Sequence, residues 1–267
     1  MNKDDLRDRL ERLLPLVRQA SELALSYFGK THSHDKPDGS IVTEADALTE
    51  RLLVDGLKSR FPGETIMGEE LGCSEGDPRY VWSIDPIDGT AAYSTRLPFW
   101  CVSVGLFYER QPVLGVVSLP ALDETYSAYR GGGAYWQSTR WGRERLSVHA
   151  EAGTSKLCPN SMICLPSNIH HRFNFNSPCK MRSLGSTAIH ALLVARNDAI
   201  SAVMSPYHWD IAGAVPILLE AGGQVGTYQG DPVDLLSLTP ERKSQYIILG
   251  SPAYIAYTRD CMVPKNQ

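Results

Sequence analysis

Two carboxylates stand three residues apart in the segment W-S-I-D-P-I-D-G-T, which contains Asp85 and Asp88. The intervening proline lacks an N–H and fixes φ, so the sequence predicts that the preceding strand ends there. The two carboxylates would then lie close together, with the Ile87 carbonyl between them. Such an oxygen-rich, doubly anionic corner suits a hard divalent cation such as Mg²⁺. Gly89 and Thr90 then predict a helix start, whose free N–H groups favour an anion.

Further acidic clusters stand at the junctions between predicted elements. Glu69 and Glu70 close an apolar run, Asp46 lies near the start of a predicted helix, and Asp210 precedes a long apolar segment. Asp-Pro and Asp-Gly pairs are common turn formers, and a single D-P-x-D-G is more often a turn than a metal site. Four acidic clusters at such junctions favour one shared site over four unrelated turns.

The order of these motifs resembles the inositol monophosphatase family of lithium-sensitive, Mg²⁺-dependent phosphatases. The matching motifs are D-G-S-I-V-T-E-A-D (38–46), G-E-E (68–70), W-S-I-D-P-I-D-G-T (82–90) and W-D-I-A-G-A (209–214). The resemblance extends from about Leu6 to Met262. It implies an α+β or α/β protein, built as a layered α-β-α-β-α sandwich with the active site between its two halves.

The resemblance also assigns roles to individual residues. It implies two or three Mg²⁺ ions with these ligands: Glu69, Asp85 and the Ile87 carbonyl for the first, Asp85 as a bridge with Asp88 and Asp210 for the second, and Glu70 with Asp46 for a weaker third ion or its waters. Thr90 and Asp46 would orient and deprotonate the attacking water, next to Glu69. The implied substrate contacts are the N–H groups of Gly89, Thr90 and Ala91 for the phosphate, and Ser167, Gly185, Ser186, Thr187 and Asp210 for the remainder.

Several of these residues also have a purely structural interpretation. Thr43 and Asp46 match a capping box, which would itself fix the Asp46 rotamer. Asp210 could be the N-cap of a helix over 211–221. Glu70 could be a solvated partner of Arg79 or Lys58, and an indirect role is as consistent with the sequence as direct ligation.

Other residues near the motifs are open to two interpretations. Lys36 resembles a family lysine in a loop that approaches the metal ions, although a loop lysine is usually only solvated. His208 is interpreted as a packing residue rather than a base. Inositol-binding members carry a glutamate seven residues before the W-D aspartate, where this chain has Val203, and Ala91-Ala92 replace a more usual polar pair. A buried acceptor is therefore missing from the expected pocket, which would broaden substrate preference.

The sequence thus predicts a Mg²⁺-dependent phosphomonoesterase for inositol monophosphate or a related polyol or sugar phosphate. The alternatives are a 3′-phosphoadenosine or nucleotide phosphatase, and a non-catalytic descendant that binds a metabolite. The former is less favoured because neither 165–170 nor 182–187 offers an obvious aromatic residue for stacking on a base. The latter is disfavoured because every metal carboxylate is retained, together with Thr90 and Asp46.

The composition of the chain limits the kinds of partner and the cell compartment that we expect for it. The 267 residues are 43% hydrophobic with a net charge of −4, which argues against nucleic acid. No apolar run approaches the length of a membrane span, and the N-terminus does not resemble a signal peptide. The six cysteines form no C-x-x-C pair, which is typical of a reduced, cytoplasmic protein. The partners expected are a small phosphorylated metabolite and a second copy in a homodimer.

The elements that must position these residues fall into two parts. Residues 1–147 are expected to form an α+β half that binds metal, with helices over 4–29 and 43–60 on a mostly antiparallel sheet of strands at 64–67, 80–85, 101–108, 113–119 and 125–130. Pro15 should kink or divide the first helix. Residues 148–267 are expected to form an α/β half that closes the site, with strands at 162–165, 199–204, 224–228 and 246–250 and helices at 186–196, 211–221 and 252–262. The polar segment 153–180 predicts an exposed loop.

Overall fold

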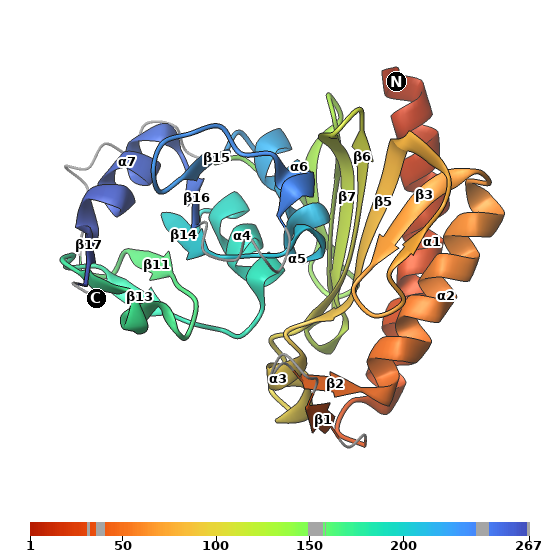
Figure 1. Cartoon of the computed structure of the whole chain (residues 1–267), viewed down its shortest axis with the longest axis horizontal. Coiled ribbons are helices and arrows are strands. Elements are labelled where there is room, and N and C mark those ends of the chain that lie inside the picture. Colours follow the sequence, from red (N-terminus) through yellow and green to blue (C-terminus); the bar gives the residue numbers. More distant parts are fainter. Residues whose placement is uncertain (31–32, 36–40, 149–156, 158, 239–245, 266–267) are drawn as a thin grey trace.

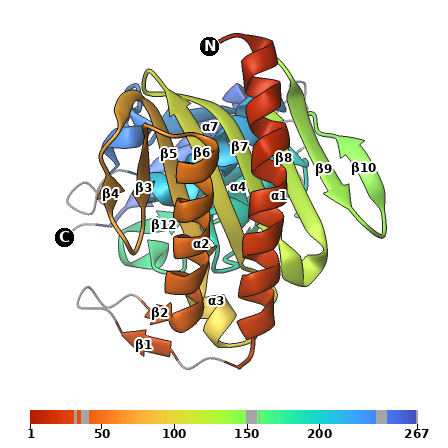
Figure 2. The ribbon, with the colours of Figure 1, turned by 90° about the vertical axis from the view of Figure 1, so that its right-hand side faces the viewer.

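Helices and sheets alternate in five layers in the computed structural model, which describes residues 1–30, 33–35, 41–148, 157, 159–238 and 246–265 (Figure 1). Two long helices form the first layer: α1 (Lys3–Tyr27) and α2 (Glu44–Arg60). They cover one face of an eight-stranded sheet, as Figure 2 shows. Three shorter helices lie between this sheet and a five-stranded one: α4 (Thr187–Ala195), α5 (His208–Ala212) and α6 (Ala214–Glu220). Helix α7 (Pro252–Cys261) covers the outer side. The predicted α-β-α-β-α sandwich is confirmed.

The large sheet is antiparallel apart from one parallel pair, as predicted. Its order is β10-β9-β8-β7-β6-β5-β3-β4, and β3 runs parallel to β5. The strands are β3 (Glu64–Gly68), β4 (Cys73–Ser74), β5 (Asp77–Asp88), β6 (Cys101–Tyr108), β7 (Gln111–Leu119), β8 (Glu124–Tyr129), β9 (Gly133–Ser138) and β10 (Gly142–Arg145). The strands β4, β9 and β10 were not predicted.

The five-stranded sheet is mixed, with the order β13-β11-β14-β16-β15. Its strands are β11 (Met162–Cys164), β13 (Lys180–Arg182), β14 (Ser201–Met204), β15 (Gln224–Thr227) and β16 (Ile247–Gly250). The remaining elements are α3 (Thr90–Ser94), the pair β1 (Ser33–Asp35) and β2 (Ile41–Thr43), the pair β12 (Phe173–Phe175) and β17 (Met262–Pro264), and the 3₁₀ turns η1 (Pro120–Leu122), η3 (Ile169–His171) and η4 (Leu235–Ser237).

Buried apolar side chains between the layers form three clusters. One lies between α1, α2 and the large sheet, with Leu13, Leu53 and Trp82 among its members. A second fills the space between the two sheets around α4, α5 and α6, and a third joins the five-stranded sheet to α7. No helix among the described residues is both long and apolar enough to cross a bilayer.

Three sequence predictions about these elements differ from the structure in part or in full. Pro15 does not divide the first helix, because α1 continues through it as one helix of 25 residues, and the alternative of a kink at Pro15 stays a prediction. The segment 153–180 is more ordered than an exposed loop, since η3 and β12 lie within it in addition to β11, which matches the strand predicted at 162–165, although 153–156 and 158 lie outside the described residues. The helix expected over 211–221 is two helices, α5 and α6, with Gly213 between them.

Candidate active site

The acidic residues singled out in the sequence meet where β5 leads into α3. Asp85, near the end of β5, is only 1% exposed. Burial raises its pKa well above the usual range, and the charges of Glu69, Asp88, Asp210 and Asp46 raise that pKa further. Side chains from α2, the end of β3, β5 and α5 therefore form one electrostatic cluster, although 164 positions separate the first from the last in sequence.

This donor set fits a hard divalent cation. Among the described residues, no three His, Cys, Asp or Glu side chains already stand in a metal-holding arrangement. The negative charge of the cluster nevertheless favours a bound cation. Buried carboxylates repel one another, and each loses its hydration, so an ion between them is stabilising. Carboxylate and carbonyl oxygens are the ligands that Mg²⁺ takes in proteins. An ion among them would offset the repulsion that raises the pKa of Asp85.

The Asp-Pro-Ile-Asp segment is a bulge within β5. We expected the strand to stop at the proline, but β5 continues to Asp88. Asp85 pairs with Ser103 and Asp88 pairs with Cys101. The chain therefore advances by three residues on β5 while it advances by two on β6. The extra residue removes the proline from the regular ladder, which is how a bulge tolerates it. It also brings both aspartates to the same strand end, and the Ile87 N–H donates to the Asp85 carboxylate at 3.1 Å.

Asp46 uses its two carboxylate oxygens differently. Oδ2 accepts the backbone N–H of Thr43 at 2.8 Å and the Thr43 hydroxyl at 2.6 Å, which is the predicted capping box at the start of α2. Oδ1 faces the hydroxyl of Thr90 at 3.3 Å, and that hydroxyl also lies 3.0 Å from the Ile87 carbonyl. The cap therefore fixes the side chain that meets Thr90. Burial raises the pKa of Asp46 to about 6.

Glu50 holds the loop that carries Glu69 and Glu70, and sequence reasoning missed it. It is fully buried on α2, and its carboxylate accepts the backbone N–H groups of Glu70 and Leu71, each at 2.8 Å. Gly68 makes room for it, because a Cβ on Gly68 would lie 1.8 Å from Glu50 Oε1. The motif G-E-E therefore needs its glycine for space. Arg79, considered as a partner of Glu70, forms a salt bridge with Asp77 at 2.7 Å.

Asp88 connects the large sheet to helix α4. Its carboxylate accepts the Ser186 hydroxyl at 2.5 Å and the N–H groups of Thr187 and Ala188 at 3.1 and 2.6 Å. Burial raises its pKa, and these hydrogen bonds oppose that shift. The bonds place the predicted substrate loop directly against the end of β5.

Gly89 and Gly185 face each other across this junction. Gly89 has φ of +95°, a conformation that favours glycine, and a Cβ there would lie 3.3 Å from the Gly185 carbonyl. Gly185 in turn lies next to Ala92. The two segments implied as substrate contacts therefore lie side by side. His190 helps to hold the second segment, because its Nε2 accepts the Leu184 N–H at 3.0 Å.

Asp210 is the third residue of α5, and it accepts the Tyr207 N–H at 2.8 Å. It is therefore not the N-cap that we had considered, because the helix begins two residues earlier. The neighbouring His208 is buried and bonds through Nδ1 to the Ser83 hydroxyl at 2.8 Å. Burial lowers its pKa to about 4, which agrees with a packing role. Gly105 lets the carbonyl of Ala212 approach β6 closely, which seats α5 against the sheet.

Three further residues considered for the site differ in where the structure places them. The side chain of Val203 is fully buried in the apolar cluster that contains Ile248 and Ile255 of α7. Our expectation that position 203 lines the pocket was therefore wrong, because on β14 this side chain points to the α7 face of the sheet. Ser167 is exposed beside η3, where its carbonyl contacts His170 at 2.9 Å. Lys36 lies outside the described residues.

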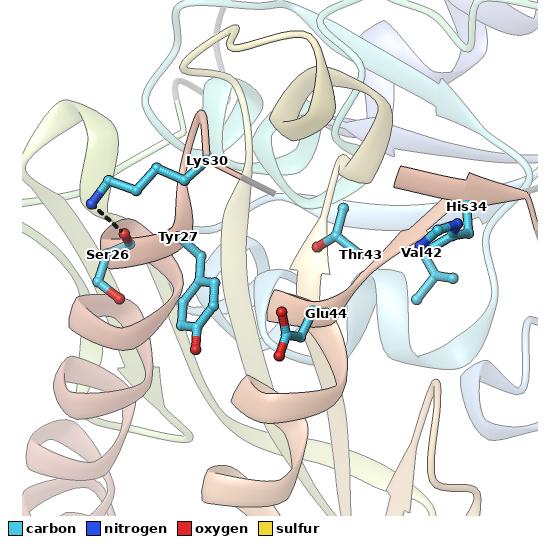
Figure 3. Close-up of a pocket in the computed structure, with 7 residues that line it drawn as sticks. All are labelled: Ser26, Tyr27, Lys30, His34, Val42, Thr43 and Glu44. Carbon is cyan, nitrogen blue, oxygen red and sulfur yellow. Dashed lines mark hydrogen bonds between the residues drawn. The ribbon is translucent and has the colours of Figure 1, made fainter. Parts of the chain in front are cut away.

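A cavity of about 790 Å³ lies beside Thr43 (Figure 3). It is lined by Ser26, Tyr27, Lys30, His34, Val42, Thr43 and Glu44. Figure 3 shows the Lys30 side chain turned toward α1, where its Nζ donates to the Ser26 carbonyl at 2.8 Å. Of the predicted site, this cavity touches only the capping threonine among the described residues.

Comparison with known proteins identifies the class of the molecule. A model of the inositol monophosphatase family matches residues 5–252. Members of this family are phosphatases, which are phosphoric monoester hydrolases. The chain belongs to the inositol monophosphatase family, as its motifs indicated. This family depends on metal ions, generally Mg²⁺, and sensitivity to lithium is general in it.

The relatives differ in the substrates that their names state. A fructose-1,6-bisphosphatase/inositol-1-monophosphatase of Thermotoga maritima is 32% identical over 86% of this chain and 89% of its own length. A histidinol-phosphatase of Chlorobaculum parvum is 33% identical over 83% of this chain and 86% of its own. The solved inositol monophosphatase structure from T. maritima superposes with a TM-score of 0.80 at 28% identity, covering 95% of this chain and 96% of that one. The homodimer and the cytoplasmic location stay predictions.

Proposed function

We propose that this phosphatase hydrolyses the monoester of a small phosphorylated polyol or sugar, inositol monophosphate among them, with two or three Mg²⁺ ions. The observation that carries the proposal is the contact between Thr90 and Asp46 beside the carboxylate cluster at Asp85. Attack by water on a phosphate requires a group that accepts the proton of the water next to a metal-binding site, and Thr90 with Asp46 would supply that group.

The ligands proposed for the ions are Glu69, Asp85, the Ile87 carbonyl, Asp88 and Asp210, with Glu70 near a third. When bound, Mg²⁺ neutralises phosphoryl oxygens and lowers the pKa of a bound water. Asp88 can bind a metal ion while it also holds α4. Its Oδ1 accepts one N–H, and a carboxylate oxygen has two lone pairs, so one lone pair remains for the ion. Asp85 receives one backbone N–H and stands at the centre of the cluster, which suits a bridging role.

The chain's own residues supply the route for the proton. The Thr90 hydroxyl can accept a proton from the attacking water while it donates its own to Asp46 Oδ1. The two Thr43 bonds occupy Oδ2, so Oδ1 is the oxygen left to receive it. With a pKa of about 6 the carboxyl is ionised at neutral pH, yet basic enough to act as a general base.

The phosphate is proposed to lie against the backbone N–H groups of Gly89, Thr90 and Ala91. The rest of the substrate would extend toward Gly185, Ser186 and Thr187, because these residues lie across from Gly89. Ser186 is buried and bonded to Asp88, so its contribution is to fix the loop. Ser167 stays a prediction as a substrate contact.

A second candidate substrate class carries a flat ring. Tyr207 and Trp209 stack with ring centroids 4.7 Å apart and planes within 8° of each other, immediately before Asp210. Both are half-buried, so part of the stack remains accessible. A flat face beside the metal site favours a nucleoside or an imidazole-bearing phosphate ester. This observation raises the rank of the nucleotide alternative, which the sequence had made the weaker one.

A released-phosphate assay separates these candidates. The substrates are inositol 1-phosphate, glycerol 2-phosphate, fructose 1,6-bisphosphate, histidinol phosphate and a 3′-nucleotide, each with Mg²⁺ and with chelator. A polyol or sugar phosphate should have the highest kcat/KM, and turnover should vanish with chelator. A preference for histidinol phosphate or the nucleotide by more than about tenfold would favour the second candidate. Turnover that survives chelation would refute the proposed metal chemistry.

A further inference from the structure

The hairpin of β9 and β10 ends the large sheet with a free edge. Strand β10 pairs with β9 and, among the described residues, with no other strand. Figure 2 shows it at the outer margin of the sheet, beyond β9 and to one side of α1. Every residue from 139 to 145 is exposed. The edge therefore offers unpaired backbone groups to an incoming strand.

The backbone groups at this edge belong to two arginines. The N–H of Leu146 donates to the Ala134 carbonyl of β9 at 2.9 Å, and Arg145 stands opposite Tyr135. Inward bonds alternate along an antiparallel strand. The backbone N–H and C=O groups of Arg143 and Arg145 therefore point away from β9, to the open side.

The same arginines bring positive charge to the edge. The Arg143 guanidinium lies 3.9 Å from the centroid of the Tyr135 ring, and the Arg145 side chain lies over Gly133 on the same face. Arg140, in the turn, lies near Trp141. In the described part of the chain, none of these three arginines forms a salt bridge, although the protein as a whole has a net charge of −4.

Trp141, at the tip of the hairpin, is 70% exposed on a turn that side-chain hydrogen bonds hold in place. The Asp123 carboxylate accepts the Thr139 hydroxyl at 2.6 Å, the Ser138 hydroxyl at 2.9 Å and the Arg140 N–H at 3.2 Å. The Ser138 oxygen also accepts the Trp141 N–H at 3.3 Å. A large aromatic side chain on a pinned turn loses little further freedom when it binds, which favours association.

We infer that this edge binds an extended acidic segment of another protein, which adds to the sheet as a strand beside β10. Main-chain hydrogen bonds to Arg143 and Arg145 would supply affinity, as in other cases of strand addition. Side chains two apart on a strand share a face. Acidic residues at alternate positions of the segment would therefore meet the two guanidinium groups, and an apolar residue at its end would cover Trp141.

Neither protection against aggregation nor pairing between two copies of this chain accounts for the edge as well. Charged residues on an edge often guard against aggregation, but such protection does not explain an exposed tryptophan at the same place. Antiparallel pairing of two β10 strands from two copies would set arginines opposite arginines, and like charges in that position repel. Charge complementarity therefore selects an acidic partner.

The test uses a short fluorescein-labelled peptide of alternating glutamate and valine, titrated with the full-length protein and followed by anisotropy. Two further peptides carry N-methyl groups either on every valine or on every glutamate. In an added strand, only every second backbone N–H points toward β10. One of the two methylated peptides should therefore keep these hydrogen bonds and bind, and the other should lose them and fail to bind. W141S and R143S should each weaken binding about tenfold or more, since each removes a central contact. Phosphatase turnover should be unchanged in both.

R18S is the matched control, because Arg18 is an exposed arginine on α1 that pairs with Glu22. It should bind the peptide like the wild type. The inference is overturned if the peptide does not bind at millimolar protein, or if both methylated series bind equally. It is also overturned if an oligouridylate binds this hairpin more tightly than the peptide, which would make the edge a nucleic-acid site. Loss of a dimer in W141S by light scattering would show a self-association surface instead.

Discussion

A single methyl group on Gly68 should disrupt the loop that carries Glu69. The Cβ of G68A would lie 1.8 Å from Glu50 Oε1 and 2.6 Å from its carboxyl carbon, so the buried carboxylate must move. It would then lose the N–H groups of Glu70 and Leu71, both of which it accepts at 2.8 Å.

The size of the effect follows from those two bonds. A hydrogen bond to a charged group contributes about 1.5–3 kcal/mol, so the pair contributes about 3–6 kcal/mol. Alanine is favoured over glycine in a strand by roughly 0.5–1 kcal/mol, which offsets part of the loss. We expect the free energy of unfolding to fall by about 3 kcal/mol. For a chain of this size Tm should fall by roughly 6–12 °C.

Two measurements on metal-free and Mn²⁺-loaded protein check this reasoning. Thermal unfolding followed by circular dichroism gives the change in Tm, and Mn²⁺ titration followed by electron paramagnetic resonance gives the affinity. Mn²⁺ affinity should fall about tenfold or more, because Glu69 is displaced with the loop. G226A is the control, since its Cβ would lie 3.2 Å from a methyl group of Ile255 and no closer than 3.8 Å to the end of the Arg259 side chain.

A double-mutant cycle identifies the cause. In an E50A background the side chain that G68A would strike is gone, so the two changes together should cost no more than E50A alone. The reasoning is refuted if the free energy of unfolding of G68A lies within about 0.5 kcal/mol of the wild-type value and the variant keeps its Mn²⁺ affinity. It is equally refuted if the losses of stability caused by G68A and by E50A simply add in the double variant.

The remaining predictions concern the cluster and its neighbours. D85N should remove nearly all turnover yet raise the Tm of the metal-free protein, because it deletes one charge from a buried cluster of like charges; phosphate release and a thermal melt check both. T90V should lower kcat by about 100-fold or more with little change in KM, whereas T90S should stay within about tenfold, since only the hydroxyl relays the proton. Lithium should inhibit uncompetitively with respect to substrate, and less strongly in D210N; a competitive pattern in initial-rate plots would speak against a second ion at Asp210. The buried His208 has a folded pKa of about 4 against 6.5 unfolded, so its contribution is complete above pH 6.5 and is lost as pH falls toward 4. From pH 7 to pH 4 the free energy of unfolding, measured by urea titration, should therefore fall by about 3 kcal/mol more in the wild type than in H208Q, and equal changes in the two proteins would contradict this assignment.

Residues beside turn formers were predictable from sequence, and residues inside regular elements were not. Asp85 and Asp88 flank a proline, and Asp46 follows a capping threonine, so local chemistry marks each of them. Glu50 sits in the middle of α2, where a glutamate usually marks a solvated face. Only the fold shows that it is fully buried against Gly68.

The substrate side was harder to predict because strand faces depend on register. Counting back from Asp210 placed Val203 in the pocket, yet a strand alternates its side chains between two faces, and β14 directs this one to α7. The hairpin of β9 and β10 was missed for another reason. Its second strand consists of a glycine and three charged residues, and no apolar alternation distinguishes it from a loop.

The central claim is that the carboxylates around Asp85 hold the catalytic metal ions. Anomalous diffraction at the manganese edge, from crystals grown with Mn²⁺ and inorganic phosphate, tests it directly. The account predicts at least two peaks about 2.0–2.3 Å from carboxylate oxygens, both next to Asp85, one shared with Glu69 and the other with Asp88 and Asp210. Manganese bound elsewhere, or no peak at Asp85 in crystals that release phosphate from substrate, would contradict it.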